Sequence, residues 1–362
     1  MNSLVKHTTD TEKRVLIIRL SSMGDVILVS TVLSYIKLKH PMWSITLITS
    51  APYLSLFRKD HRVKELYAAD DDDALNGIKP HFYKVIDLQN SSKSKRLIKR
   101  LGITGGVQKF KKLHLQRFLL LFTRINTYDL TNGVAARYLQ AAGAHRNTPP
   151  PSLKLYFDSE PKPECSKLFQ KEGEIIRPMI ALFPFSAWRN KEWPAENFIK
   201  LGTYFSLKGW KVLIMGGVED VAAARQISLE IGNNCVSLAG KLTLFECGTV
   251  LKNCTLALGG DTGLSHLARA CGVKTGVIFG PTTRHFGFYP YGLPMFRVFE
   301  TGLRCRPCHP HGGNVCIRGK RNCMISLSPE MVTKTMEGMV QQGDNNSSEI
   351  TALDTSFCTH HF

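Results

Sequence analysis

A chain of 362 residues predicts two domains or one large domain, and a hydrophobic content of 43% is enough for sizeable cores. The 47 Lys and Arg outnumber the 29 Asp and Glu, and the resulting charge of +18 favours polyanionic partners such as nucleic acid, anionic lipid or phosphorylated glycan. No apolar run reaches the roughly 18 residues of a membrane span, and the first residues lack the apolar core of a signal peptide. The ten cysteines do not indicate a disulfide scaffold in a chain this long, so we expect a protein of a reducing compartment that is not exported.

The first half opens with a strand, a glycine-containing turn and a helix. Val15–Leu20 is a continuous aliphatic run, typical of a parallel strand buried on both faces, and Val26–Leu38 has an amphipathic helical pattern. Asp25 lies in the turn between them, where a catalytic or ligand-binding side chain is expected beyond the carboxyl end of a strand. The alternative for Asp25 is an ordinary helix N-cap. Three further strands and a helix are expected at Ile45–Thr49, Val63–Tyr67, Tyr83–Leu88 and Asn132–Ala142.

A basic segment without a single acid lies between Asp87 and Asp129. Apolar residues alternate with its basic ones, a pattern typical of a helix that lies on an anionic lipid surface. The alternative is a solvated helix that packs on its own sheet. The basic residues are Lys93, Lys95, Arg96, Lys99, Arg100, Lys109, Lys111, Lys112, Arg117 and Arg124.

The prolines Pro149, Pro150 and Pro151 mark a boundary, because they cannot continue a helix or a central strand. Strands and helices alternate again after it, which predicts two doubly wound α/β domains that face one another across a cleft. We expect domains at 1–150 and 151–342 and a disordered tail at 343–362. The predicted elements of the second half are Met179–Phe183, Ala195–Leu207, Lys211–Met215, Glu219–Ile231, Val236–Leu238, Leu244–Leu251, Thr255–Leu258, Leu264–Cys271 and Lys274–Phe279.

Polar residues follow two of these strands directly. The loop after Met179–Phe183 offers Ser186, Arg189 and Lys191 at a strand's carboxyl end, where they suit a diphosphate. Without a ligand they would form a solvated loop before a helix. Glu219 and Asp220 follow the next strand, at the position from which an acid commonly holds ribose hydroxyls. Their other role is to favour a helix N-terminus.

In the stretch from Cys254 to Thr283, a buried strand ends sharply at a turn formed by Gly259, Gly260, Asp261, Thr262 and Gly263. Its glycines let backbone amides approach a ligand, and the helix that follows favours an anion at its N-terminus. His266 lies one helical turn further on, toward the same ligand position. Because G-x-G-x-x-G is absent, the turn suits a sugar diphosphate better than a dinucleotide. The alternative is an ordinary capped glycine turn.

Four cysteines near the end, Cys305, Cys308, Cys316 and Cys323, are spaced C-x2-C-x7-C-x6-C. Four thiolates in a short loop with glycine and proline suit a tetrahedral structural metal, zinc or iron, and the alternative is four ordinary thiols.

Three motifs resemble the heptosyltransferases of glycosyltransferase family nine: SSMGDV after the first strand, FPFSAWRNKEWP, and LGGDTGLSHLARACGV with IFGPTT. The resemblance covers about Val15 to Met324 and implies a GT-B fold, in which the N-terminal domain binds the acceptor and the C-terminal domain holds ADP-heptose. It implies that Asp25 is the general base, that Lys191 contacts the donor phosphates, and that Glu219 or Asp220 binds ribose. The diphosphate would lie on Gly260, Asp261, Thr262, Gly263 and His266. The FPFSAW form departs from the threonine-rich form of some relatives at Ser186.

From the resemblance we expect an inverting transfer of heptose from ADP-heptose to a hydroxyl of the lipopolysaccharide inner core, without a cofactor for catalysis. The expected partners are ADP-heptose, a lipid A-core acceptor and the anionic inner membrane surface, and nucleic acid is not expected. Lys109, Lys111, Lys112 and Arg117 would meet the acceptor or that surface, which predicts a cytoplasmic, peripheral protein on the inner face of the inner membrane. The alternatives are a protein O-heptosyltransferase and a non-catalytic basic metal- and nucleic-acid-binding protein.

Overall fold

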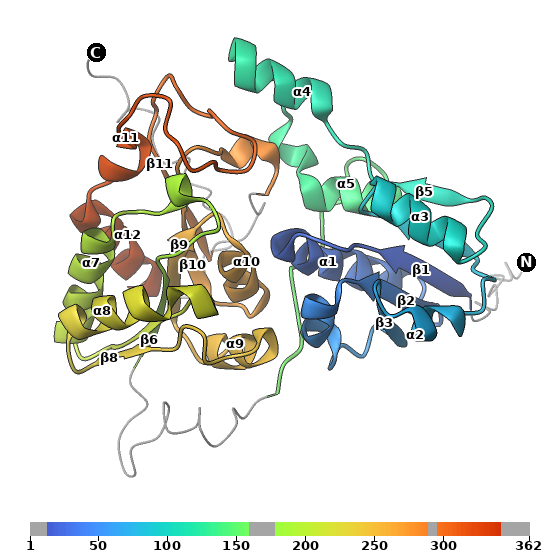
Figure 1. Ribbon diagram of the computed structural model, residues 1–362, viewed down its shortest axis with the longest axis horizontal. Coiled ribbons are helices and arrows are strands. Elements are labelled where there is room, and N and C mark those ends of the chain that lie inside the picture. Colours follow the sequence, from blue (N-terminus) through green and yellow to red (C-terminus); the bar gives the residue numbers. More distant parts are fainter. Residues whose placement is uncertain (1–12, 159–177, 289–294, 342–362) are drawn as a thin grey trace, which may run out of the picture. The chain divides into compact units, whose positions relative to one another are not determined.

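The structure is a computed structural model that describes residues 13–158, 178–288 and 295–341 (Figure 1). These residues form two compact units. The first contains 13–112 and 134–156, and the second contains 113–133 together with the described residues from 157 onward. The chain therefore leaves the first unit after residue 112, contributes residues 113–133 to the second unit, and returns to the first unit for residues 134–156. The predicted tail at 343–362 lies outside the described residues.

The first unit is built on a parallel sheet in the order β3-β2-β1-β4-β5. The aliphatic residues of β1 and β2 are buried, as expected for central strands covered on both faces. The order reverses between β1 and β4, and in doubly wound sheets ligands bind beyond the strand ends at such a point. The strands are β1 Arg14–Ile18, β2 Ser44–Thr49, β3 Glu65–Ala68, β4 Lys84–Asp87 and β5 Val107–Lys109. The helices of this unit are α1 Met23–Lys39, α2 Asp72–Asn76, α3 Ser92–Arg100 and α5 Val134–Ala141, with a 3-10 helix at Ala51–Phe57.

The second unit has a parallel sheet in the order β11-β10-β9-β6-β7-β8, which reverses between β6 and β9. Its core packs the inner side chains of β6, β7 and β9 against α7, α8 and α12. The strands are β6 Met179–Phe183, β7 Lys211–Ile214, β8 Cys235–Ser237, β9 Leu256–Gly260, β10 Lys274–Phe279 and β11 Phe296–Glu300. The longer helices are α7 Ala195–Leu207, α8 Val221–Ile231, α9 Leu244–Leu251, α10 Gly263–Ala270 and α12 Pro329–Gln341. Shorter pieces are α4 His114–Phe118, α11 Asn322–Ile325, a π-helical turn at Leu119–Thr123, and 3-10 turns at Leu130–Asn132, Arg189–Lys191, Val218–Asp220 and Arg284–Phe286.

The fold class predicted from the sequence, two doubly wound α/β units, is confirmed. The sequence did not predict two strands, β5 and β11, and both are edge strands. β5 has only three residues, and β11 buries Phe296 and Phe299 but leaves Arg297, Val298 and Glu300 half-buried. Edge strands lack the continuous apolar run that identifies a central strand, so their pattern resembles that of a loop.

The basic segment is not one interfacial helix, as the pattern of charges suggested. It divides into α3, β5, α4 and the π-helical turn. α3 buries Leu97 and Ile98 in the core of the first unit, so this part packs on its own sheet, the alternative weighed above. The basic residues of α3 lie on its exposed face, and its apolar residues are explained by packing in the core.

Candidate active-site residues

A polar cluster in the second unit lies beyond the carboxyl ends of β6, β9 and β10. Lys191, in the 3-10 turn after β6, places its Nζ 2.8 Å from Asp261 Oδ2 and 2.9 Å from the Asp261 carbonyl oxygen. Thr282, after β10, donates its hydroxyl to the same carboxylate at 3.1 Å. The loops that follow β6, β9 and β10 thus meet at the reversal point of the sheet. An ammonium has three donors, so Lys191 keeps one beyond the two that it gives to Asp261.

The Lys191–Asp261 pair is nearly buried, with side chains 11% and 12% exposed. Burial raises the pKa of Asp261, but the neighbouring Lys191 charge and the hydrogen bonds from Lys191 and Thr282 outweigh burial, so the pKa lies below its ordinary value. Asp261 is therefore an anion at neutral pH that holds the lysine in place.

The N-terminus of α10 lies immediately after Asp261 and has no side-chain cap. Thr262 is the N-cap residue, with extended backbone, but it makes no side-chain cap hydrogen bond. Its Oγ1 is a buried oxygen without a partner among the residues that the structure describes. An uncapped helix N-terminus with an unsatisfied hydroxyl beside it is suited to accept an anion. Gly263, the first residue of the helix, is half-buried there.

Gly260 allows the closest approach in the cluster. A Cβ at this position would lie 2.9 Å from the Lys191 carbonyl oxygen. Only glycine therefore lets the end of β9 pass beside the lysine loop, which is a packing role in addition to the ligand approach predicted from the sequence.

His266 is buried in the second turn of α10, with 5% exposure. Burial and the neighbouring Arg269 charge lower its pKa to about 3, so the ring is neutral at physiological pH. Arg269 Nη1 lies 3.2 Å from His266 Nδ1, and a guanidinium can only donate. The ring proton therefore resides on Nε2, where it can serve as a donor.

The remaining donor-side predictions lie at the ends of β6 and β7. Ser186 accepts a hydrogen bond from the Trp188 amide at 3.2 Å, which shapes the loop. Asp220 accepts from the Gly217 amide at 2.7 Å, and burial raises its pKa. Glu219 is exposed at the same strand end. Of the two acids, Asp220 is therefore occupied in the turn and Glu219 is available to a ligand.

Asp25 lies in the first turn of α1, at the reversal point of the first unit's sheet. The N-cap of α1 is Ser22, so Asp25 is not the cap that the alternative proposed. Its Oδ2 lies 2.8 Å from Arg19 Nη2 and accepts from Ser22 Oγ at 3.0 Å, and its Oδ1 accepts from the Tyr138 hydroxyl at 3.1 Å. The carboxylate is 13% exposed. It is thus held in one orientation while part of it stays accessible.

The sequence interpretation missed three partners: Arg19, Tyr138 and Thr282. Arg19 lies two residues before the SSMGDV turn, and Thr282 belongs to the IFGPTT motif, so both are in or beside motifs already recognised. Tyr138 lies far along the chain on α5 and is fully buried, with its pKa raised well above the ordinary value by burial and by the Asp25 charge. Nothing in the local pattern connects it with Asp25.

The predicted basic residues are divided between the units. Lys109, Lys111 and Lys112 belong to the first unit, where Lys112 Nζ donates to the Asn90 carbonyl at 2.8 Å. Arg117 belongs to the second, with its guanidinium 6.0 Å from the centre of the Phe286 ring. Beside Arg117, α4 and the turns after it leave four large apolar side chains more than half exposed: Leu115, Phe118, Phe122 and Ile125.

The four predicted metal-binding cysteines lie in one segment of the chain, from Cys305 in a loop to Cys323 in α11. Burial and the charges of neighbouring thiols raise the pKa of Cys308, and burial outweighs the other influences in raising the pKa of Cys323 to about 11. Within residues 13–158, 178–288 and 295–341, however, no three His, Cys, Asp or Glu side chains form a ready set of metal ligands.

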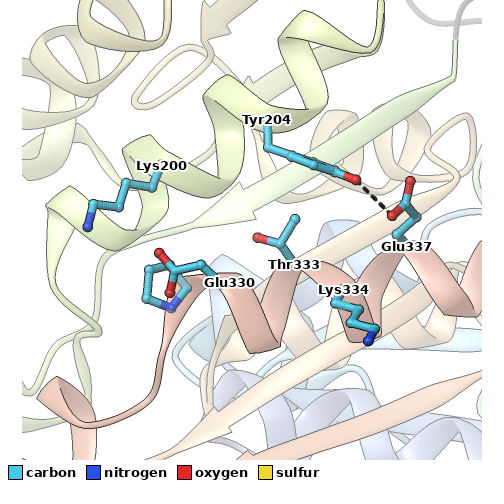
Figure 2. A pocket seen from close by; sticks show the side chains of 7 residues that line it. Lys200, Tyr204, Glu330, Thr333, Lys334 and Glu337 are labelled. Carbon is cyan, nitrogen blue, oxygen red and sulfur yellow. Dashed lines mark hydrogen bonds between the residues drawn. The ribbon is translucent and has the colours of Figure 1, made fainter.

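A cavity of about 420 Å³ lies between α7 and α12, away from the polar cluster (Figure 2). Its walls present both signs of charge, and Tyr204 donates to Glu337 across it at 2.8 Å. Because two lysines and two glutamates line it, the cavity does not favour a ligand of one charge. The lining residues are Lys200, Tyr204, Pro329, Glu330, Thr333, Lys334 and Glu337. Across the described part of the chain, no helix has both the length and the apolar character of a membrane span.

Solved structures show that the fold has close counterparts. A glycosyltransferase of family 9 from Veillonella parvula matches with a TM-score of 0.73 at 20% identity, over 92% of this chain and 98% of that one. The ADP-heptose lipopolysaccharide heptosyltransferase II of E. coli matches at 0.69 and 19%, over 91% and 99%. The iron-containing dodecameric glycosyltransferase TibC of E. coli matches at 0.58 and 13%, over 92% and 81%. These similarities confirm the predicted GT-B fold class.

Sequence comparison points to the same group. The lipooligosaccharide heptosyltransferase 2 of Haemophilus influenzae is 28% identical over 52% of this chain and 56% of its own length, so the match spans about half of that relative. The family model described as glycosyltransferase family 9 (heptosyltransferase) matches residues 78–309. Because that model covers more than half of the chain, the protein belongs to glycosyltransferase family 9, the heptosyltransferases.

Proposed function

We propose that the protein transfers heptose from ADP-heptose to a hydroxyl of the lipopolysaccharide inner core, with inversion at the anomeric carbon. Family membership and relatives named as lipopolysaccharide or lipooligosaccharide heptosyltransferases support this proposal. The observation that carries it is the Lys191–Asp261–Thr282 cluster beside the uncapped N-terminus of α10. A cation with a spare donor next to free helix amides is suited to a sugar diphosphate.

On the donor side, the remaining Lys191 proton and the amides of α10 would bind the diphosphate. Thr262 would gain the partner that its buried Oγ1 lacks among the described residues, and the Nε2 proton of His266 would add a neutral donor. Glu219 would accept from the ribose hydroxyls, because Asp220 is occupied by the Gly217 amide. These donors would stabilise the charge that gathers on ADP as it leaves.

On the acceptor side, Asp25 would be the general base. The acceptor oxygen forms a bond to the anomeric carbon, its proton passes to Asp25, and the bond between that carbon and the ADP oxygen breaks. Arg19, Ser22 and Tyr138 fix the carboxylate, so its accessible part can meet one hydroxyl in one orientation. No step in this sequence requires a cofactor.

The test is Asp25→Asn, assayed with ADP-heptose and a truncated lipid A-core acceptor. We expect transfer to fall about 10²- to 10⁴-fold while ADP binding is unchanged, because a general base is removed. Near-normal transfer would exclude this role for Asp25. Transfer to protein serines in place of the lipid acceptor would favour a protein O-heptosyltransferase. Thermal stabilisation by an oligonucleotide and not by ADP would favour a nucleic-acid binder.

We also propose that the protein works at the inner face of the inner membrane. What supports this is the exposed apolar group Leu115, Phe118, Phe122 and Ile125 in a stretch that has no acid between Asp87 and Asp129. Apolar side chains with basic neighbours are suited to the boundary between anionic headgroups and acyl chains. The acceptor, a lipid, would be reached at the same surface.

The four loop thiols would hold one structural zinc or iron ion. What supports this is the C-x2-C-x7-C-x6-C spacing of the four cysteines, and thiolates are the ligands that both metals accept. Because the described side chains do not already form a ligand set, the loop would have to tighten on binding. Elemental analysis of purified protein tests this: about one metal per chain supports the proposal, and metal-free protein of unchanged stability contradicts it.

A further inference from the structure

The cysteine-rich loop, residues 305–323, contacts the lysine loop of the donor cluster directly. The Asn190 amide donates to the Gly313 carbonyl at 3.2 Å, and the Arg189 amide donates to Asn314 Oδ1 at 3.1 Å. Both bonds fall on the 3-10 turn that carries Lys191. The loop therefore provides part of the hydrogen bonding that this turn, too short to form a stable helix, cannot provide itself.

Arg321 extends this support to both sides of Lys191. Its Nη1 donates to the Arg189 carbonyl at 2.6 Å and to the Glu192 carbonyl at 3.0 Å. These two carbonyls flank the lysine in the chain, so one guanidinium nitrogen closes the turn around it. Lysine could not substitute fully, because the planar guanidinium presents its donors in a fixed arrangement.

A second arginine of the loop holds the other side of the cluster. Arg306 Nη2 donates to the carbonyls of Phe279 and Thr282, each at 3.0 Å, and its Nε donates to that of Gly280. Thr282 is the residue that binds the Asp261 carboxylate. Both partners of the Lys191–Asp261 pair are therefore connected to the cysteine-rich loop through an arginine.

We propose that the cysteine-rich loop positions the donor-binding cluster, and that Arg321 is a positioning residue for Lys191. The inference rests on the proposed contact between Lys191 and the donor diphosphate. It assigns the loop a role that does not depend on whether its thiols bind a metal. The hydrogen bonds that Arg321 makes to this turn end on the backbone on either side of Lys191, so its effect on the ligand passes through the lysine.

The experiment compares Arg321→Gln with Arg318→Gln by calorimetric titration of ADP and of adenosine. Arg318 is an exposed arginine in the same loop, so its variant removes the same charge from nearly the same place. We expect Arg321→Gln to weaken ADP binding about tenfold, because the charge-assisted hydrogen bond from Lys191 to the diphosphate would lose its alignment. Adenosine has no phosphate, so its binding should weaken less than about twofold. Arg318→Gln should change both affinities less than about twofold.

A double-mutant cycle with Lys191→Ala separates positioning from other effects. If Arg321 acts through the lysine, Arg321→Gln should lower the affinity for ADP less than about twofold when Lys191→Ala is already present. An additive cycle, an equal loss with Arg318→Gln, or an equal loss for adenosine would overturn the inference. Unchanged ADP binding by Lys191→Ala alone would instead refute the donor role of the lysine. Should Arg321→Gln fail to fold, Asn314→Ala tests the same support from the Arg189 side, with the same expected preference for ADP.

Discussion

Replacing Asp261 with Asn is the sharpest test of the donor cluster, because it removes a charge and almost no volume. Breaking a buried ion pair by removing one charge costs about 3–5 kcal/mol. Both side chains are about one-tenth exposed, and the Asn oxygen can still accept from Lys191 and Thr282, so we expect a loss of about 2 kcal/mol. A unit of this size loses about 2–4 °C per kcal/mol, so the melting transition should fall by about 4–8 °C.

The same variant should weaken ADP binding less than Lys191→Ala does, because the Asn oxygen can still accept from Lys191 and the ammonium assigned to the diphosphate remains. The assay is scanning calorimetry with and without ADP, with Glu196→Gln, an exposed carboxylate of the same unit, as the control. A variant that melts with the wild type would refute the structural role of the pair. ADP binding that weakened as much as in Lys191→Ala would contradict the view that the lysine, and not Asp261, meets the phosphate.

The stability difference between wild type and Asp261→Asn should also depend on pH. The pKa of Asp261 is lowered in the folded protein, so the stability it contributes is present above its ordinary pKa of about 4. That contribution is lost as pH falls through the lowered folded value. The two melting transitions should therefore stay apart at constant spacing above about pH 5 and converge in more acidic solution. A spacing that grew on acidification would contradict the sign of the shift.

Three other variants probe separate parts of the account. Tyr138→Phe should lower kcat about tenfold with both KM values unchanged, because a hydrogen bond that orients the catalytic carboxylate is lost, and rate measurements at saturating substrates check this. Gly260→Ala should cost about 1–3 kcal/mol in thermal unfolding and weaken ADP binding, because the added Cβ would meet the Lys191 carbonyl. Changing Lys109, Lys111 and Lys112 to Gln should raise the acceptor KM and leave donor affinity alone. That effect should shrink as salt rises, since exposed charges are screened beyond about 8 Å at physiological ionic strength; salt-independent kinetics would contradict it.

The strand ends could be read from the sequence because the central strands are continuous aliphatic runs. Where such a run stops, polar side chains of the loop that follows lie at the ligand-binding edge of the sheet. This reasoning located Asp25, Lys191 and Asp261, and the structure brings the last two together at 2.8 Å. The tyrosine that orients Asp25 could not be found in the same way. Tyr138 lies on α5, and no local sequence pattern connects that helix with the first turn of α1.

The basic segment shows a second limit of sequence patterns. Apolar residues among lysines and arginines look alike whether they face lipid or a sheet of the same protein. In α3, Leu97 and Ile98 are core residues, whereas in and after α4 Phe118 and Phe122 are exposed. Both parts combine apolar residues with basic ones, and it is the position of the neighbouring sheet that decides which apolar side chains are buried. For the same reason, the contribution of residues 113–133 to the second unit had no signature in the sequence.

The measurement that tests the central claim most directly is the mass of the product formed from ADP-heptose and a truncated lipid A-core acceptor. The account predicts an acceptor heavier by one heptose residue and an equal amount of released ADP with the wild type. It predicts the loss of both products, with ADP binding retained, in Asp25→Asn. Release of ADP without a gain in acceptor mass, or transfer that survives in Asp25→Asn, would contradict it.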